Sequence, residues 1–92
     1  MTVELVFFQG CPHVDDARRN LRAALTELGQ PLKWVEWDRE SPDTPEGLRA
    51  YGSPTVLVDG RDVTGESGRA QGAACRADGA PSAARIRAAL ES

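Results

Sequence analysis

The sequence predicts an α/β fold in which a mixed four-stranded sheet carries helices on its faces. Strand-like and helix-like segments alternate along the chain, and an Asp-Gly pair separates the last two strand-like segments. A strand–helix–strand unit usually forms a parallel pair with a right-handed crossover. A two-residue Asp-Gly turn, in contrast, makes the strands that it joins antiparallel. The sheet is therefore expected to contain both kinds of pairing.

Two strands separated by one long helix are expected in the first half of the chain. Residues 3–8 are rich in β-branched and aromatic side chains, as in a buried strand. From Val14 onwards apolar residues recur at helical spacing, and charged residues cover the other sides. Pro12 suits the first helical position, because its missing N–H has no intrahelical partner there. Gly29 favours the left-handed conformation that ends many helices, and residues 32–38 form the second predicted strand.

The second half is expected to contain a short helix, a strand, its hairpin partner and a last helix, at residues 45–51, 52–58, 61–64 and 81–90. Asp59-Gly60 is the strongest short-range signal for a hairpin. Residues 65–79 are rich in glycine and alanine without periodicity, so they are expected to form a loop. Such a length is unusual within a small domain, which makes this loop a functional candidate.

Composition limits the classes of function. The 92 residues fit one domain covering residues 1–92, and 14 acidic against 11 basic residues argue against nucleic-acid binding. No apolar run approaches the ~18 residues of a membrane span. The N-terminus lacks the features of a signal peptide, so a cytoplasmic protein is expected. Two cysteines do not form a disulfide scaffold there, which favours a catalytic or metal-binding role for a cysteine.

Two short motifs carry a resemblance to the thioredoxin/glutaredoxin superfamily. Gly-Cys-Pro-His at residues 10–13 is similar to its redox motif, and Gly-Ser-Pro-Thr at residues 52–55 is similar to the motif that holds a cis-proline beside the reactive sulfur. The resemblance covers nearly the whole chain and depends on the order and the context of the two motifs. It implies a thioredoxin-like fold with the element order βαβ-α-ββα.

A narrower resemblance is to a group of small bacterial thioredoxin-like proteins, often described as related to alkylmercury lyases. It adds Val-Asp-Gly-Arg-Asp at residues 58–62 and Ala-Cys-Arg at residues 74–76 to the two motifs. Some relatives have selenocysteine at the position of Cys11. That replacement implies redox chemistry at this residue.

Cys11 is the candidate nucleophile and redox-active cysteine. The thiolate is the reactive form, and a helix N-terminus favours it through unpaired N–H groups and the positive end of the helix dipole. His13 allows two interpretations: it adds positive charge or a hydrogen bond to the sulfur, or it is an exposed residue at the helix start without a role. Asp15 and Asp16 in the first turns oppose the thiolate. The alternative is that Cys11 only fills space in the core.

The sequence leaves two possibilities for the thiol that resolves a mixed disulfide at Cys11. A dithiol site of the superfamily has a second cysteine three residues on, where this chain has Val14. In one reading Cys11 acts as a monothiol and forms a mixed disulfide, from which an external thiol such as glutathione releases it. In the other reading Cys11 pairs with Cys75. The superfamily's corresponding loop passes near the reactive cysteine, which implies Cys75 as a conditional resolving residue. A buried, unreactive Cys75 is the alternative.

Substrate binding is expected at Ser53, Pro54 and Thr55, with His13 beside them. The resemblance implies a cis peptide bond before Pro54. This bond would leave the Ser53 backbone open to an extended substrate, which adds as a short strand. An ordinary trans proline in a turn is the alternative reading of the same residues.

Together these features predict a thiol–disulfide oxidoreductase that needs no cofactor. Its partner is a thiol or disulfide substrate, such as glutathione or a protein disulfide, or a small electrophile that Cys11 reduces. One alternative is a soft-metal protein that binds mercury or copper through Cys11, His13 and Cys75. A further alternative is a redox-silent interaction module, because a fold can outlast its chemistry.

Overall fold

Four strands form one mixed sheet in the computed structural model, which describes residues 2–64 and 80–91. The strands are β1 (Val3–Phe7), β2 (Val35–Asp38), β3 (Thr55–Val58) and β4 (Arg61–Asp62), in the spatial order β2-β1-β3-β4. β1 pairs in parallel with β2 and antiparallel with β3, and β3 pairs antiparallel with β4. The predicted α/β class with a mixed four-stranded sheet is confirmed.

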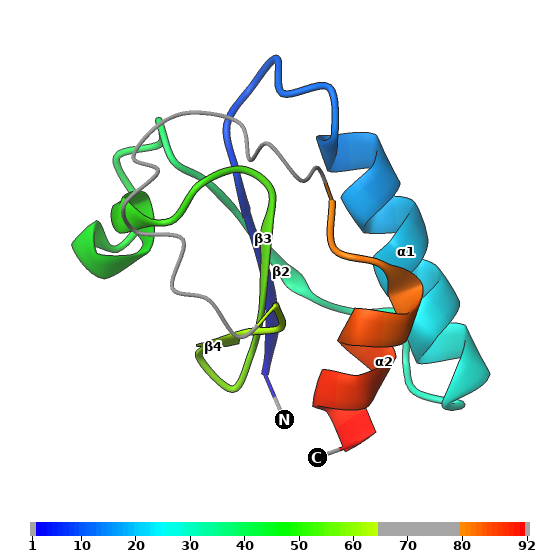
Figure 1. The fold of residues 1–92 in the computed structure, drawn as a ribbon. Helices are drawn as coiled ribbons and strands as arrows, with labels where there is room; N and C mark the ends of the chain where they lie inside the picture. Colours follow the sequence, from blue (N-terminus) through cyan, green and yellow to red (C-terminus); the bar gives the residue numbers. More distant parts are fainter. Residues whose placement is uncertain (1, 65–79, 92) are drawn as a thin grey trace.

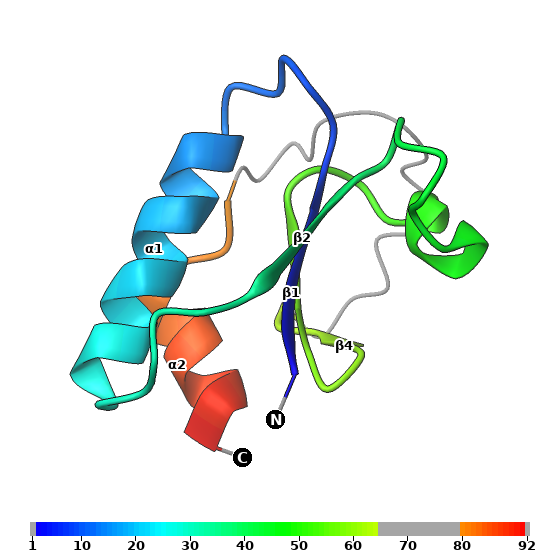
Figure 2. The ribbon, with the colours of Figure 1, turned by 180° about the vertical axis from the view of Figure 1, so that it is seen from behind.

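Both α-helices lie on the same face of the sheet. Helix α1 (Val14–Glu27) and helix α2 (Ala83–Glu91) pack side by side, and Figures 1 and 2 show both of them on one side of the strands. The 3-10 helix η1 (Glu46–Ala50) lies on the other side. The sequence predicts helices on the faces of the sheet. The two α-helices share one face, and only this short helix lies on the other side. In the described ranges no helix has the length and apolarity to cross a membrane.

The core lies between the sheet and the two helices. Alternate residues of β1 and β3 face the helices, because successive side chains of a strand point to opposite faces. The buried cluster comprises Val3, Leu5, Phe7, Cys11, Val14, Ala17, Leu21, Ala24, Leu25, Val56, Val58, Ile86 and Leu90. Most of its helical members come from the face of α1 that the spacing of apolar residues predicts.

Helix α1 begins two residues later than Pro12, so the prediction for Pro12 is wrong. His13 occupies the N-cap with φ −96°, and Val14 is the first helical residue. The Val14 N–H donates to the Cys11 carbonyl at 3.4 Å, which closes a turn over Pro12 and His13. At the other end Gly29 has φ +67°, as the sequence predicts.

The hairpin between β3 and β4 forms as predicted, but β4 is shorter. Asp59 and Gly60 have φ values of 51° and 82°, which are left-handed at both central positions of the turn. The Asp62 Oδ1 atom accepts hydrogen bonds from the Thr64 N–H at 2.9 Å and from its hydroxyl at 2.8 Å. The Val63 N–H still donates to the Val56 carbonyl at 3.0 Å, and the Asp62 side chain holds the turn that follows β4.

The predicted loop at residues 65–79 lies outside the described residues.

Strand β2 is also shorter than predicted. The Lys33 N–H donates to the Pro31 carbonyl at 2.9 Å, so the chain still turns where residues 32–38 were expected to be extended. Pairing with β1 begins at Val35, which lies opposite Glu4. The local turn therefore removes three residues from the predicted strand.

Shortening Leu21 tests the packing of α1 on the sheet. Leu21 is fully buried in the core cluster, so Leu21→Ala removes apolar contacts and leaves a cavity. We expect the free energy of unfolding to fall by about 2–5 kcal/mol, measured by urea denaturation. Arg22→Ala is the control, because Arg22 is exposed on the same helix, and its effect should stay within about 0.5 kcal/mol. Equal effects of the two substitutions would contradict this packing.

Candidate functional site

Cys11 lies in the turn between the carboxyl end of β1 and the start of α1, at the top of Figure 1. Its N–H donates to the Phe8 carbonyl at 3.3 Å, and its carbonyl accepts the Val14 N–H. The side chain is 8% exposed and belongs to the core cluster. Cys11 therefore stands just before the helix, held by main-chain hydrogen bonds on both sides.

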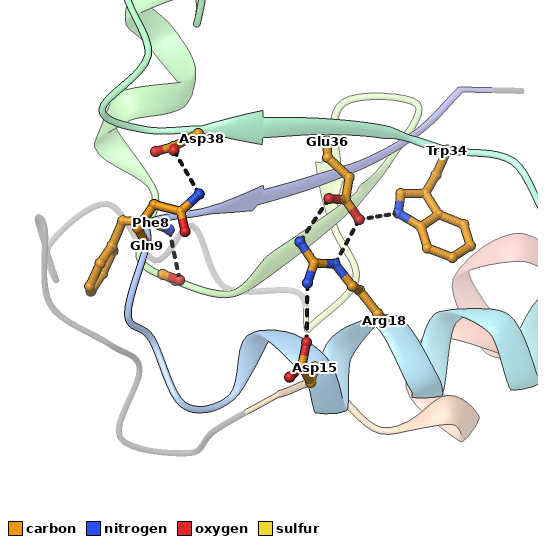
Figure 3. A network of polar contacts seen from close by, with 8 residues as sticks. Phe8, Gln9, Asp15, Arg18, Trp34, Glu36 and Asp38 are labelled. Atoms are coloured by element: carbon orange, nitrogen blue, oxygen red, sulfur yellow. Dashed lines mark hydrogen bonds and ion pairs between the residues drawn. The ribbon is translucent and has the colours of Figure 1, made fainter.

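The sulfur of Cys11 rests against the segment that leads into β3. Its thiol donates to the Ser53 carbonyl, with 3.6 Å between Sγ and O. The Ser53 Oγ atom accepts the Phe8 N–H at 3.2 Å, a contact drawn in Figure 3. Ser53 is fully buried, and its peptide bond to Pro54 is cis, as the resemblance to the superfamily implies. The structure thus brings Cys11 and Ser53 together from positions 42 residues apart.

The other predicted site residues occupy different positions around this contact. The Thr55 hydroxyl donates to the Gly52 carbonyl at 2.8 Å and is fully buried. His13 is partly buried at the N-cap, and its side chain makes no capping hydrogen bond. Cys75 lies outside the described residues, so the expected pairing with Cys11 stays a prediction.

A surface pocket of about 210 Å³ opens beside Cys11. It lies between the end of β1 and the first turns of α1. Its walls include Phe7, Phe8, Gln9, Cys11, Asp15 and Arg18. Polar atoms make up most of its exposed surface, and the two phenylalanines contribute only a minor apolar part. Cys11 supplies the thiol of this pocket.

An ion-pair network borders the same pocket and joins α1 to β2 (Figure 3). The Arg18 Nε and Nη2 atoms donate to both carboxylate oxygens of Glu36, at 3.0 and 2.9 Å. Nη1 of Arg18 donates to Asp15 at 3.1 Å, and the Trp34 indole donates to Glu36 at 2.9 Å. The guanidinium also lies 5.3 Å from the centroid of the Phe7 ring. The bidentate geometry fixes the guanidinium in one orientation.

The two acidic residues in the first turn of α1 are each paired with an arginine. Asp15 bonds to Arg18, and Asp16 bonds to Arg19 at 3.0 Å. The Asp15 side chain is 85% exposed. Each carboxylate therefore has an opposite charge one turn along the helix.

The pairing of Arg18 with Glu36 changes the proton affinity of both groups. The hydrogen bond from Arg18 lowers the pKa of Glu36, and the Trp34 hydrogen bond adds to this effect, while partial burial opposes it. The hydrogen bond with Glu36 raises the pKa of Arg18. Glu36 is therefore ionised throughout the neutral pH range. The network keeps its charges under the conditions in which a thiol would react.

The described residues hold no group of three or more histidine, cysteine, aspartate or glutamate side chains arranged for a metal ion. The soft-metal alternative combines Cys11 and His13 with Cys75. Its third ligand lies outside the described ranges, so the alternative stays a prediction.

Sequence reasoning missed the residues that surround the thiol on the side of β2. Phe8 falls at the end of the predicted strand at residues 3–8, and Arg18 falls on the charged side of the predicted helix, so local patterns mark neither as a site residue. Gln9 donates to Asp38 at 3.2 Å, which links the Cys11 turn to the end of β2. The predicted parallel pairing of β1 with β2 is the feature of the sequence that could have pointed to these residues. It places β2 beside β1, so that Glu36 of β2 comes near Arg18 of α1.

Neutralising Glu36 tests the network through its pH dependence. Since the pKa of Glu36 is lower in the folded than in the unfolded chain, its carboxylate stabilises the fold above the unfolded pKa of about 4.3. This contribution is lost as the pH falls through the lowered pKa. Glu36→Gln should cost about 0.5–1 kcal/mol at pH 7, because both partners are about one-third exposed.

The measurement is the free energy of unfolding in urea from neutral to acidic pH. The difference between the native protein and Glu36→Gln should shrink as the pH drops below about 4. Glu40→Gln is the control, because Glu40 is exposed and takes part in no ion pair with a residue in the described ranges. A pH-independent difference would show that Glu36 does not act through its charge.

The Cys11 turn combines a thiol, a carbonyl contact from the start of β3 and an adjoining pocket. No family model, curated protein or solved structure matches the chain. The arrangement of these residues is therefore the basis on which a function is assigned.

Proposed function

We propose that the protein is a thioredoxin-like, thiol-dependent oxidoreductase in which Cys11 is the nucleophile. The observation that carries the proposal is the contact of the Cys11 sulfur with the Ser53 carbonyl at 3.6 Å, beside a pocket to which the same thiol contributes.

The arrangement of the elements supports a thioredoxin-like fold. A parallel pair of β1 and β2 connected by α1 is followed by an antiparallel hairpin of β3 and β4 and by a last helix. The reactive cysteine of that fold stands between the first strand and the first helix. The Ser-Pro motif of that fold stands at the start of the third strand, and in this chain these two positions are in contact.

The surroundings of Cys11 suit attack on a small disulfide. The thiol donates to a carbonyl, so the reaction begins when the sulfur gives its proton to solvent and this contact is lost. Phe7 and Phe8 provide apolar wall beside the sulfur, and Gln9 and Arg18 provide polar groups at the border of the pocket. The pocket has room for the leaving part of a low-molecular-weight disulfide.

The reaction is thiol–disulfide exchange. The Cys11 thiolate attacks one sulfur of the substrate disulfide, the substrate S–S bond breaks, and the other half leaves as a thiolate. A mixed disulfide of Cys11 and the first half remains. A second thiol then attacks this half, a new disulfide leaves, and Cys11 returns as a thiolate. Glutathione is our candidate for the second thiol. In the intramolecular alternative Cys75 attacks the Cys11 sulfur, the first half leaves as a thiolate, and the Cys11–Cys75 disulfide that remains is reduced by glutathione.

Replacing Cys11 tests the proposal directly. The assay follows reduction of 2-hydroxyethyl disulfide with glutathione as the reductant, at neutral pH. Cys11→Ser should lower kcat/KM by at least about 1,000-fold, because the nucleophile is removed. Cys75→Ser is the matched control. It should retain formation of the Cys11–glutathione mixed disulfide, which intact-mass measurement detects as one added glutathione.

Two results would contradict the proposal. One is turnover by Cys11→Ser at the level of the native protein. The other is a Cys11 that reacts with a disulfide reagent no faster than free cysteine. If Cys75 resolves the intermediate, Cys75→Ser should accumulate the mixed disulfide, and if glutathione does so, the two proteins should accumulate it equally.

A further inference from the structure

A second pocket, of about 350 Å³, lies at the opposite end of β3 from Ser53. It is bounded by the β3–β4 hairpin and by one side of α2. Its walls are Val58, Arg61, Asp62, Val63, Arg85, Ala88 and Ala89. Strand β3 separates it from the Cys11 site, because Val58 is the last residue of the strand and Ser53 precedes its first.

The pocket combines an aliphatic floor with two guanidinium groups. Val58 is buried, and Val63 and Ala89 are half-buried against the core cluster. Arg61 and Arg85 are exposed residues from the hairpin and from the first half of α2. Volumes of this size with mostly apolar walls and a few polar groups are typical of small-molecule sites.

Arg61 and Arg85 have guanidinium N–H groups that form no ion pair with the described residues. Arg85 donates through Nη1 to the Thr64 carbonyl at 2.9 Å, which turns its guanidinium toward the hairpin. Asp62 directs Oδ1 to Thr64. Counted over the described residues of its walls, one carboxylate stands against two guanidinium groups, so their sum is positive, although the chain as a whole carries a net charge of −3.

Arg87 of the same helix, on the side that faces α1, forms ion pairs. It pairs with Glu27 at 2.8 Å and with Glu91 at 3.5 Å. Arg85 lies two residues earlier and points to the hairpin instead. Among the described residues, carboxylates therefore pair with the arginine on one side of α2 and not with Arg85 on the other.

We propose that this pocket binds a small organic carboxylate that has an apolar body. The carboxylate is held by Arg61 and Arg85, since a guanidinium binds a carboxylate with paired, charge-assisted hydrogen bonds. The apolar body covers the side chains of Val58, Val63 and Ala89. The site is independent of the proposed Cys11 chemistry.

Two probes of the same shape separate charge from apolar contact. 3-Phenylpropionate and its neutral amide, 3-phenylpropionamide, are titrated into the full-length, 15N-labelled protein, and amide resonances are followed. The carboxylate should shift Val58, Val63, Ala88 and Ala89 with a Kd on the order of 1 mM, as expected for a probe of this size. The neutral amide should bind at least about tenfold more weakly.

Three variants locate the binding site. Arg85→Gln and Arg61→Gln should each weaken binding of 3-phenylpropionate at least about tenfold. Arg87→Gln, on the opposite side of α2, should leave the Kd within about twofold. The spectra themselves report whether each variant is folded, and the comparison of the two probes on the native protein needs no variant.

Three results would overturn the inference. The first is equal binding of the carboxylate and the amide, which would make the pocket an apolar groove without charge selectivity. The second is an equal loss in Arg87→Gln and Arg85→Gln, which would indicate a general effect of charge. The third is the absence of saturable shifts at the pocket residues up to about 10 mM probe. Activity of Cys11 enters none of these readouts.

Discussion

The pairing of β1 with a neighbour on each side is the constraint on which the rest of the structure depends. Val6 lies opposite Thr55 of β3, and Phe7 lies opposite Asp38 of β2. The carboxyl end of β1 is therefore held between the start of one strand and the end of another. The chain that leaves this end carries Phe8, whose N–H is bound by the Ser53 hydroxyl. Through this register, the turn that contains the thiol meets the Ser-Pro segment.

Helix α1 is attached to the sheet by two kinds of interaction with different weights. Its buried face contributes most of the stability, since each fully buried aliphatic side chain contributes about 1.5–3 kcal/mol. The Arg18–Glu36 pair is one-third exposed, and pairs of this kind contribute at most about 1 kcal/mol. Its main effect is on orientation, because a bidentate contact fixes the rotation of the helix start relative to β2. Apolar packing thus stabilises α1 on the sheet, and the ion pair fixes the orientation of Arg18 in the wall of the pocket beside Cys11.

The two ends of the sheet have different electrostatic character. At the end with Cys11, Asp15, Glu36 and Arg18 share their charges within one network. At the end with the hairpin, two guanidinium groups border an apolar pocket without ion pairs to residues in the described ranges. Strand β3 connects both ends, with Ser53 just before it and Val58 as its last residue. The proposed thiol chemistry and the proposed carboxylate site therefore use opposite ends of one strand.

Features that depend on neighbouring residues can be predicted from the amino-acid sequence. The alternation of strands and helices, the apolar face of α1 and the left-handed Asp59-Gly60 turn follow from local spacing and backbone preference, and the structure has all three. Which groups meet in space is a property of the folded chain. The placement of both helices on one face and the Arg18–Glu36 pair depend on contacts between distant segments. Strand register and helix packing create these contacts, and a local pattern does not encode either of them.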